Sequence, residues 1–187
     1  SGPLSSDLVV ADFRLGDGVR RGQDLLSAIR SLQHDLPIVA VAAVSPTVDL
    51  SLCVDAIEAP ANILYQWNFV RGLKGRMRRK AQWFPDRFAL DRLDAIRSVR
   101  EFDEVYTAPH FGFKNATDYY HRASAMRVID RVRVPARIIT AEDDPFVPTA
   151  PFREAIVARN PRLHVTITSH GGHCAFVSEP DSAHDGY

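Results

Sequence analysis

The chain has few of the features that would assign it to a specialised class of protein. Its 187 residues include only two cysteines, Cys53 and Cys174, which form neither a Cys-x-x-Cys pair nor a zinc-binding spacing. Lys plus Arg and Asp plus Glu both total 23, so no net charge favours nucleic acid as a partner. No apolar run reaches the roughly 18 residues that a membrane span needs, and no secretory signal opens the chain. We therefore expect a soluble, cytoplasmic protein without a nucleic-acid partner.

The sequence also lacks the motif Gly-x-Ser-x-Gly, a strained strand-to-helix turn that exposes a nucleophilic serine. No serine of the chain has glycine at both of the positions two residues away. Ser45 has the most exposed position expected for any serine, at the end of a strand. Its neighbours Val44 and Pro46 do not provide the small residues that the strained turn needs. No nucleophile is therefore identified in this chain.

The elements that are present alternate between strands and helices. With 45% hydrophobic residues, the chain can bury one core. Short apolar or β-branched runs indicate strands, and apolar residues at helical spacing indicate helices. The expected strands cover residues 7–13, 36–44, 136–140 and 163–168, and the expected helices cover 23–32, several segments of 50–130, and 150–159. This order predicts an α/β fold with a mostly parallel sheet and a helical insertion at about residues 50–130.

Two polar motifs follow the last two expected strands. Asp144 lies in Ala-Glu-Asp-Asp-Pro-Phe-Val-Pro, and His173 ends His-Gly-Gly-His. Because parallel strands end at one edge of a sheet, we expect these two side chains to lie within hydrogen-bond reach, as in a Ser-His-Asp triad. The alternative is structural, since Asp and Pro favour turns and Asp143 could cap the next helix. His170 is the weaker candidate, because it is nearer the strand end and is expected to pack.

Basic and aromatic residues gather in the first half of the helical insertion. The basic residues are Arg71, Lys74, Arg76, Arg78, Arg79 and Lys80, and the aromatic residues are Trp67, Phe69, Trp83 and Phe84. One interpretation is a solvated helix face with its aromatic side chains toward the core. The other is a surface that attracts anionic lipid headgroups. Peripheral contact with a membrane is therefore an open hypothesis.

Several further motifs resemble those of the YheT-like α/β-hydrolases, relatives of the eukaryotic α/β-hydrolase-domain lipases. From His-Asp-Leu-Pro at 34–37 to Val-Ser-Pro at 44–46, the chain resembles the family's strand after the nucleophile helix. The motifs that resemble its cap are Arg-Glu-Phe-Asp at 100–103, Thr-Ala-Pro at 107–109, Gly-Phe at 112–113 and Asp-Tyr-Tyr at 118–120. Asp-Asp-Pro-Phe-Val-Pro and His-Gly-Gly-His resemble its acid and histidine motifs. By this resemblance Asp144 is the triad acid and His173 the general base.

The resemblance implies a serine hydrolase that acts on carboxylic esters, either acyl lipids or small acyl esters, with no cofactor and no metal. The triad performs acyl transfer, in which Asp144 orients His173 and His173 moves the proton. The helical segment 50–130 corresponds to a cap that shapes the acyl pocket. Within this segment, the expected lining is formed by Trp67, Phe69, Trp83 and Phe84.

The N-terminal part departs from the family's pattern. Asp12 to Gly18 resembles the family's strand-end loop, but Leu32 is followed almost directly by His34, where a strand, the nucleophile turn and a helix are expected. We therefore expect residues 1–187 to form a single, incomplete α/β-hydrolase domain with a gap at about residues 32–34. The alternative to an active enzyme is a catalytically inactive remnant of the fold, or a ligand-binding protein.

Overall fold

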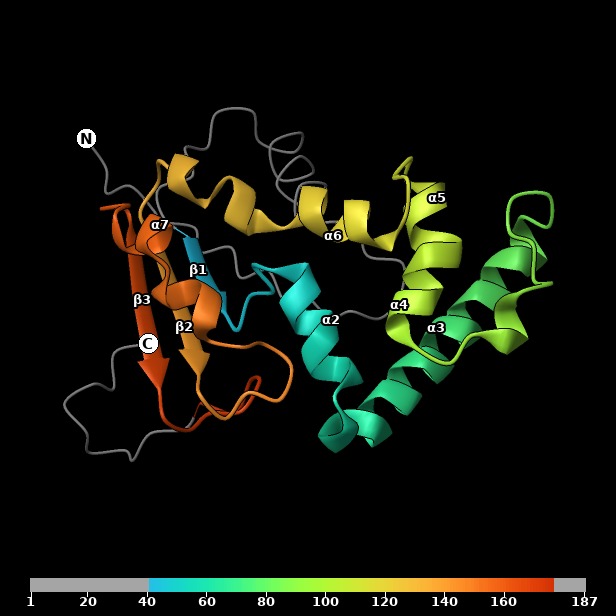
Figure 1. Cartoon of the computed structure of the whole chain (residues 1–187), viewed down its shortest axis with the longest axis horizontal. Helices are drawn as coiled ribbons and strands as arrows, with labels where there is room; N and C mark the ends of the chain where they lie inside the picture. Colours follow the sequence, from blue (N-terminus) through green and yellow to red (C-terminus); the bar gives the residue numbers. More distant parts are fainter. Residues whose placement is uncertain (1–40, 177–187) are drawn as a thin grey trace, which may run out of the picture. The chain divides into compact units, whose positions relative to one another are not determined.

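The computed structural model describes residues 41–176, drawn in colour in Figure 1. The chain divides into Ser1–Ile38 and Val39–Tyr187, and every described residue belongs to the second unit. The strand expected at 7–13, the helix expected at 23–32 and the gap expected at 32–34 all lie outside the described residues.

Within residues 41–176, three parallel strands form a sheet in the order β1-β2-β3. They are β1 (Val41–Val44), β2 (Ala136–Ala141) and β3 (Leu163–Thr168). Ala141 pairs with Thr168, so β2 and β3 end at the same level. The strands expected at 136–140 and 163–168 are confirmed, and the described part of the apolar run 36–44 ends in β1.

The segment between β1 and β2 is helical, as the sequence predicts. Its α-helices are α2 (Leu50–Glu58), α3 (Ile63–Trp83), α4 (Val99–Phe102), α5 (Ala108–His110) and α6 (Ala116–Ala123). A π-helical stretch, Asp103–Thr107, joins α4 to α5, and four short 3-10 turns complete the segment. Within residues 41–176 no strand lies between Val44 and Ala136, and no helix is both long and apolar enough to cross a membrane.

Local sequence explains where several helices begin. Side-chain oxygens of Asp49, Ser98 and Asn115 accept hydrogen bonds from the backbone N–H groups of Leu52, Glu101 and Asp118, respectively. Such caps satisfy donors that the first turn of a helix leaves free. The helix expected at 150–159 is broken instead into a 3-10 turn, Ala150–Arg153, and the short α7, Ala155–Ala158.

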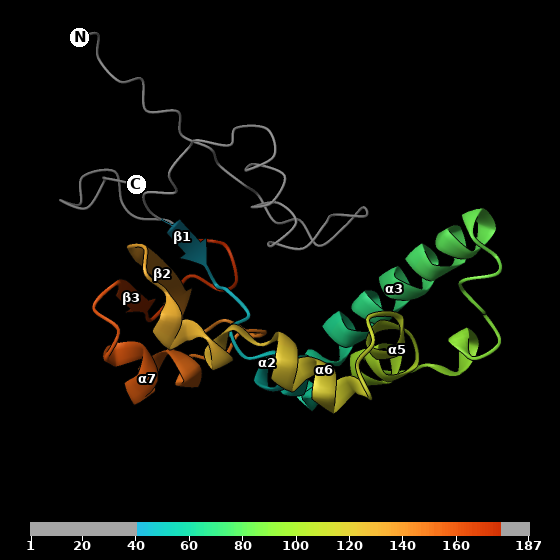
Figure 2. The ribbon, with the colours of Figure 1, turned by 90° about the horizontal axis from the view of Figure 1, so that it is seen from above.

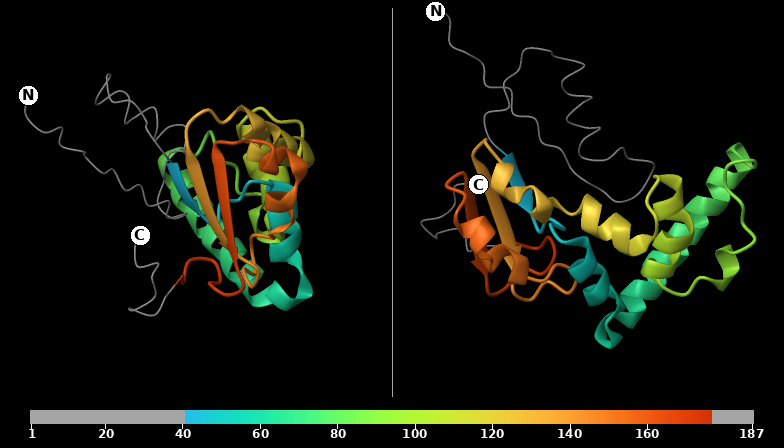
Figure 3. Two further views of the ribbon diagram at one scale, coloured as in Figure 1. Left: turned by 90° about the vertical axis from the view of Figure 1, so that its left-hand side faces the viewer. Right: turned by 45° about the horizontal axis from the view of Figure 1, so that its top comes forward.

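Buried apolar side chains form separate clusters at the sheet and among the helices. One face of the sheet packs against α7 and α2, with a core of Val48, Cys53, Ile129, Ile138, Val147, Phe152 and Val157. Figures 2 and 3 show α7 on this face. A second cluster joins α3 to α4 and the turn before it, through Val70, Met77, Leu93, Ile96 and Phe102. The insertion therefore has an apolar core of its own.

A polar joint holds α2, α4 and α6 together. The hydroxyl of buried Tyr120 donates to Asp103 at 2.7 Å, and burial raises the pKa of the Asp103 carboxyl above its ordinary value. Arg100 pairs with Asp55 and Glu58 of α2, and its guanidinium lies 5.3 Å from the ring centre of Tyr120. The motifs Arg-Glu-Phe-Asp and Asp-Tyr-Tyr thus serve the packing of the insertion.

Substituting Tyr120→Phe should lower the free energy of unfolding by about 1–3 kcal/mol, because a buried carboxylate loses its hydroxyl donor. Urea unfolding followed by circular dichroism measures the change. Tyr65→Phe, on a half-exposed ring of α3, is the matched control and should change stability by less than about 0.5 kcal/mol. Equal effects of the two substitutions would show that the Tyr120 hydroxyl does not hold the joint.

Candidate active site

Asp144 lies in the loop that follows β2, with both carboxylate oxygens engaged. Its Oδ1 accepts hydrogen bonds from the backbone N–H groups of Phe146 and Val147, at 2.8 and 3.0 Å. Its Oδ2 lies 3.0 Å from Nδ1 of His173. The Asp144 side chain is fully buried, whereas that of His173 is 39% exposed. The backbone therefore fixes the carboxylate so that its second oxygen faces the imidazole.

The paired strand ends explain why these two residues meet. Asp144 follows Ala141 by three residues and His173 follows Thr168 by five, and Ala141 and Thr168 are partners in the sheet. The distance of 3.0 Å confirms the expectation that Asp144 and His173 lie within hydrogen-bond reach. When Nδ1 of His173 carries the proton and donates it to Asp144, Nε2 is left as a base. The catalytic role of the pair stays a prediction.

Asp143 holds the loop that carries His173. Its Oδ1 accepts a hydrogen bond from the backbone N–H of Gly172 at 2.8 Å, and this bond is the main cause that lowers the pKa of Asp143. The expected packing of His170 is wrong, because its side chain is 91% exposed and lies 3.5 Å from Asp143. At the end of β3, the Thr168 hydroxyl donates a hydrogen bond to the His170 carbonyl at 2.8 Å.

The helical insertion contacts this loop at the junction of α2 and α3. The Asn62 side-chain amide donates to the carbonyl of Pro145 at 2.7 Å and to that of Ala56 at 2.8 Å. Sequence reasoning missed Asn62, since an Asn before a helix indicates only a cap. The bonds tie the residue after Asp144 directly to the insertion.

An aromatic cluster continues this contact up to the histidine. Tyr65 and Phe69 of α3 meet the Phe146 ring edge-on, at 5.0 and 5.9 Å between ring centres. Phe146 in turn lies 5.5 Å from the imidazole of His173. Of the four aromatic residues expected to line a pocket, Phe69 joins this cluster, whereas Trp67, Trp83 and Phe84 are exposed. Tyr65 and Phe146 were not singled out by the sequence.

Two other nucleophilic side chains lie near the carboxyl ends of the strands. Ser45 follows β1, but it is only 3% exposed, so its expected exposure is wrong. Its φ of +43° is unusual for a residue with a side chain, and its Oγ has no hydrogen-bond partner within residues 41–176. Burial, reinforced by the charges of Asp49 and Asp144, raises the pKa of the Cys53 thiol to about 12. Cys53 is therefore an inert thiol. It packs in the core with Val147 of the loop that carries Asp144, which we call the acid loop.

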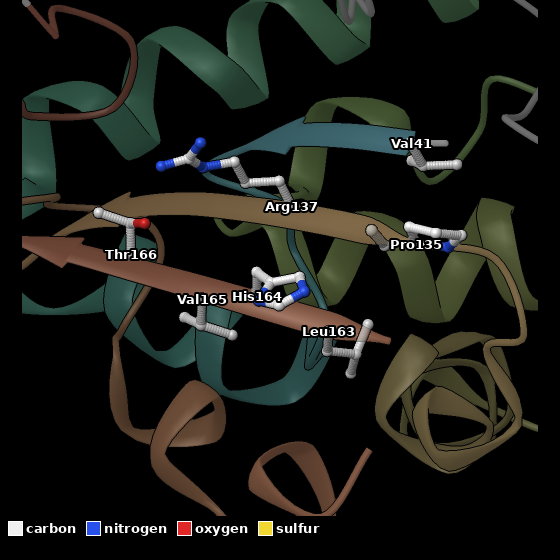
Figure 4. A pocket seen from close by; sticks show the side chains of 8 residues that line it. Val41, Pro135, Arg137, Leu163, His164, Val165 and Thr166 are labelled. Atoms are coloured by element: carbon white, nitrogen blue, oxygen red, sulfur yellow. The ribbon is translucent and has the colours of Figure 1, made fainter. Parts of the chain in front are cut away.

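A hollow of about 590 Å³ lies on the sheet away from the Asp144–His173 pair. It is lined by Val41, Pro135, Ala136, Arg137, Leu163, His164, Val165 and Thr166, most of which Figure 4 labels along the strands. Neither Asp144 nor His173 lines it. No cluster of three or more potential metal-binding side chains occurs in the described part of the chain.

Comparison with curated proteins identifies the family. The chain is 32% identical over 165 residues to Putative esterase YheT of Escherichia coli, an alignment that covers 86% of this chain and 48% of that protein. The chain belongs to the YheT-like α/β-hydrolases. The parallel sheet with its helices is accordingly part of an α/β-hydrolase fold.

Other curated relatives are matched over comparable or shorter stretches. Phospholipase ABHD3 of Mus musculus is 28% identical over 157 residues, which cover 83% of this chain and 38% of that protein. Medium-chain fatty acid ethyl ester synthase/esterase 2 of Saccharomyces cerevisiae is 44% identical over 90 residues, or 48% of this chain and 20% of that protein. The chain thus spans about half, or less, of the length of these relatives. No family model and no solved structure matches the chain.

The loop that carries His173 should tolerate a side chain at Gly172 but not at Gly171. Gly171 has a φ of +155°, and an added Cβ would lie 2.5 Å from the Phe176 ring, whereas the space around Gly172 is open. Gly171→Ala should therefore destabilise the fold by about 1–3 kcal/mol. Gly172→Asn, at a φ of +52° that asparagine adopts, should cost less than about 1 kcal/mol. Thermal unfolding of the two variants compares them, and equal losses would contradict the assigned loop geometry.

The Gly172 amide should report the protonation of Asp143. The folded-state pKa of Asp143 lies below the ordinary 3.8, so its ionised carboxylate stabilises the loop at pH values above the unfolded-state pKa. This stabilisation is lost as pH falls through the lower, folded value. We expect the ¹⁵N-amide resonance of Gly172 to titrate with a midpoint below 3.8 and to become insensitive to pH in Asp143→Asn. A midpoint at or above 3.8 would mean that the hydrogen bond does not form in solution.

Proposed function

We propose that the protein is a carboxylic-ester hydrolase of the serine type and that this chain supplies its acid, Asp144, and its general base, His173. The observation that carries the proposal is the 3.0 Å contact between Nδ1 of His173 and Oδ2 of Asp144. The other oxygen of Asp144 is held by two backbone N–H groups, so the carboxylate has one orientation. A purely structural turn would need only the two backbone hydrogen bonds to Oδ1 of Asp144. It does not explain why the imidazole of His173 lies against Oδ2.

The proposed mechanism is acyl transfer through a serine ester. Nε2 of His173 takes the proton of the serine hydroxyl as the serine attacks the substrate carbonyl, and then gives it to the leaving alkoxide. Asp144 keeps the imidazole oriented and stabilises its protonated form. In the second half of the reaction, His173 activates water in the same way, and the carboxylic acid is released. No step requires a cofactor or a metal ion.

The serine and the backbone N–H that binds the oxyanion belong to a nucleophile turn, a motif that this chain lacks. Within residues 41–176, β1 is an edge strand, and its Val41 and Val44 are exposed. Parallel sheets of α/β proteins are buried on both faces and continue beyond such a strand. We place the missing nucleophile strand beside β1.

The proposed substrates are esters with an apolar acyl or alcohol part, drawn from lipids or from small acyl esters. The support is the aromatic contact of Phe146 with His173, which places an apolar wall beside the base. The related proteins named above include an esterase, a phospholipase and a fatty acid ethyl ester synthase/esterase. The segment 50–130 is proposed as the cap over the site, and the cytoplasm as the location.

The second candidate is an inactive hydrolase fold or a ligand-binding protein, which the missing nucleophile motif favours. For this reason the 187-residue chain should hydrolyse an activated short-chain ester at a rate near background. Loss of a triad nucleophile removes on the order of 10⁶ in kcat, and loss of one oxyanion donor roughly 10²–10³, in overlapping effects. A serine-directed fluorophosphonate should label no residue. Turnover that is lost in His173→Ala, together with one labelled serine, would show that this chain carries its own nucleophile.

The proposed roles of Asp144 and His173 can be tested where a nucleophile is present. Residues 41–176 would replace the matching segment of the Escherichia coli relative. The chimera should hydrolyse the ester and react with the fluorophosphonate, and His173→Ala should lower kcat by about 10³-fold or more. His170→Ala is the matched control and should change kcat less than tenfold. A chimera equally active with and without the His173 imidazole would refute the proposal.

A further inference from the structure

Helix α3 carries a concentrated positive charge in a chain without net charge. Its 21 residues contain no Asp or Glu, and its basic residues are Arg71, Lys74, Arg76, Arg78, Arg79 and Lys80. The segment that follows, 84–98, mixes Asp and Arg and adds no excess of either sign. Asp94 pairs with Arg78 at 2.6 Å, which offsets one of the cations. Helix α3 therefore keeps a net positive charge.

Both tryptophans of the chain lie exposed near the two ends of this cationic helix. Trp67 is 60% exposed and Trp83 is 79% exposed. They are separated by 16 residues, or about 24 Å along the helix axis. Large apolar side chains seldom gather on a free surface without a binding role, and Trp favours the boundary between water and lipid.

Some of the exposed apolar and basic side chains share one face of α3, because Leu64, Trp67, Arg71 and Arg78 lie within about 60° of one another around the helix. Trp83 lies about 160° from Trp67 and is not on this face. Leu64, which is 78% exposed, and then Arg71 and Arg78 recur at intervals of seven residues, or two helical turns. The adjoining face, about 100° away, carries Val70 and Met77, which pack into the insertion's core. The guanidinium of Arg71 lies over the Trp67 ring, 4.8 Å from its centre, so the cation and the aromatic ring form one surface. Figure 1 shows α3 as the longest uninterrupted helix.

We propose that this exposed face of α3 binds the surface of an anionic lipid bilayer, with Leu64 and Trp67 entering the interface and Arg71, Lys74 and Arg78 contacting acidic headgroups. Charge complementarity favours an anionic bilayer as the partner, because a purely apolar partner would leave the basic residues without a binding role. On another side of α3, Tyr65 and Phe69 contact Phe146 of the loop that carries Asp144. If the proposed ester hydrolysis holds, the contact with the bilayer brings the site to lipid esters, but binding itself does not depend on hydrolysis.

Intrinsic fluorescence provides the test, because all tryptophan emission of the 187-residue chain comes from α3. Vesicles of phosphatidylglycerol and phosphatidylcholine should shift the emission to the blue and carry the chain down on sedimentation, whereas phosphatidylcholine vesicles should not. Brominated acyl chains in the anionic vesicles should quench the emission. High salt should weaken binding, since it screens the headgroup charge.

Charge variants provide the matched comparison. Arg71→Gln with Lys74→Gln should weaken binding to the anionic vesicles by roughly 30-fold, at about fivefold for each cation removed. Arg159→Gln with Arg162→Gln removes the same charge from exposed sites by the sheet and should change binding less than twofold. Trp67→Ala should weaken binding and leave the helical circular dichroism unchanged.

Four outcomes would overturn the proposal. One is a folded chain that does not bind anionic vesicles. Another is equal binding to neutral and anionic vesicles, which would leave the basic residues without a role. The third is an equal loss of vesicle binding in both double variants, which would mean that the total charge of the protein, and not the charge on α3, determines binding. Binding of an acidic protein or of nucleic acid in place of the vesicles would also assign this surface to another partner.

Discussion

The hydrogen bond between Asp144 and His173 depends on two parallel strands that end at the same level. Each residue lies on a short loop, and each loop begins from a paired position, Ala141 on β2 and Thr168 on β3. The backbone N–H groups after Asp144 fix one carboxylate oxygen, and Asp143 anchors the opposite loop at Gly172. Consecutive acidic residues therefore have different tasks, since one faces the imidazole and the other holds the loop that carries it.

The helical insertion is physically continuous with this site. Asn62 binds the carbonyl of Pro145, and the aromatic rings of α3 reach Phe146, which contacts His173. A displacement of α3 would act on the acid loop through a hydrogen bond and on the imidazole through ring contacts. The polar joint around Tyr120 and Asp103 gives the insertion internal rigidity. The same helix therefore joins a charged outer surface to the proposed catalytic pair.

The sequence predicts the strands at β2 and β3 and the meeting of Asp144 with His173, because β-branched runs and polar strand-end motifs are local signals. It predicts the helical character of 50–130 for the same reason. It fails for His170 and Ser45, whose exposure depends on how the chain turns after each strand and on what packs there. It also misses Asn62 and Phe146, whose partners lie far along the chain, so no local pattern marks them.

Nitrogen-15 NMR of the imidazole of His173 tests the central claim most directly. At a pH where the ring is neutral, the account predicts a proton on Nδ1, donated to Asp144, and an unprotonated Nε2. The Nδ1 proton should appear as a sheltered, low-field resonance, and it should disappear from that position in Asp144→Ala. A ring that carries its proton on Nε2, or one whose resonances are unchanged by Asp144→Ala, would show that the carboxylate does not orient the base.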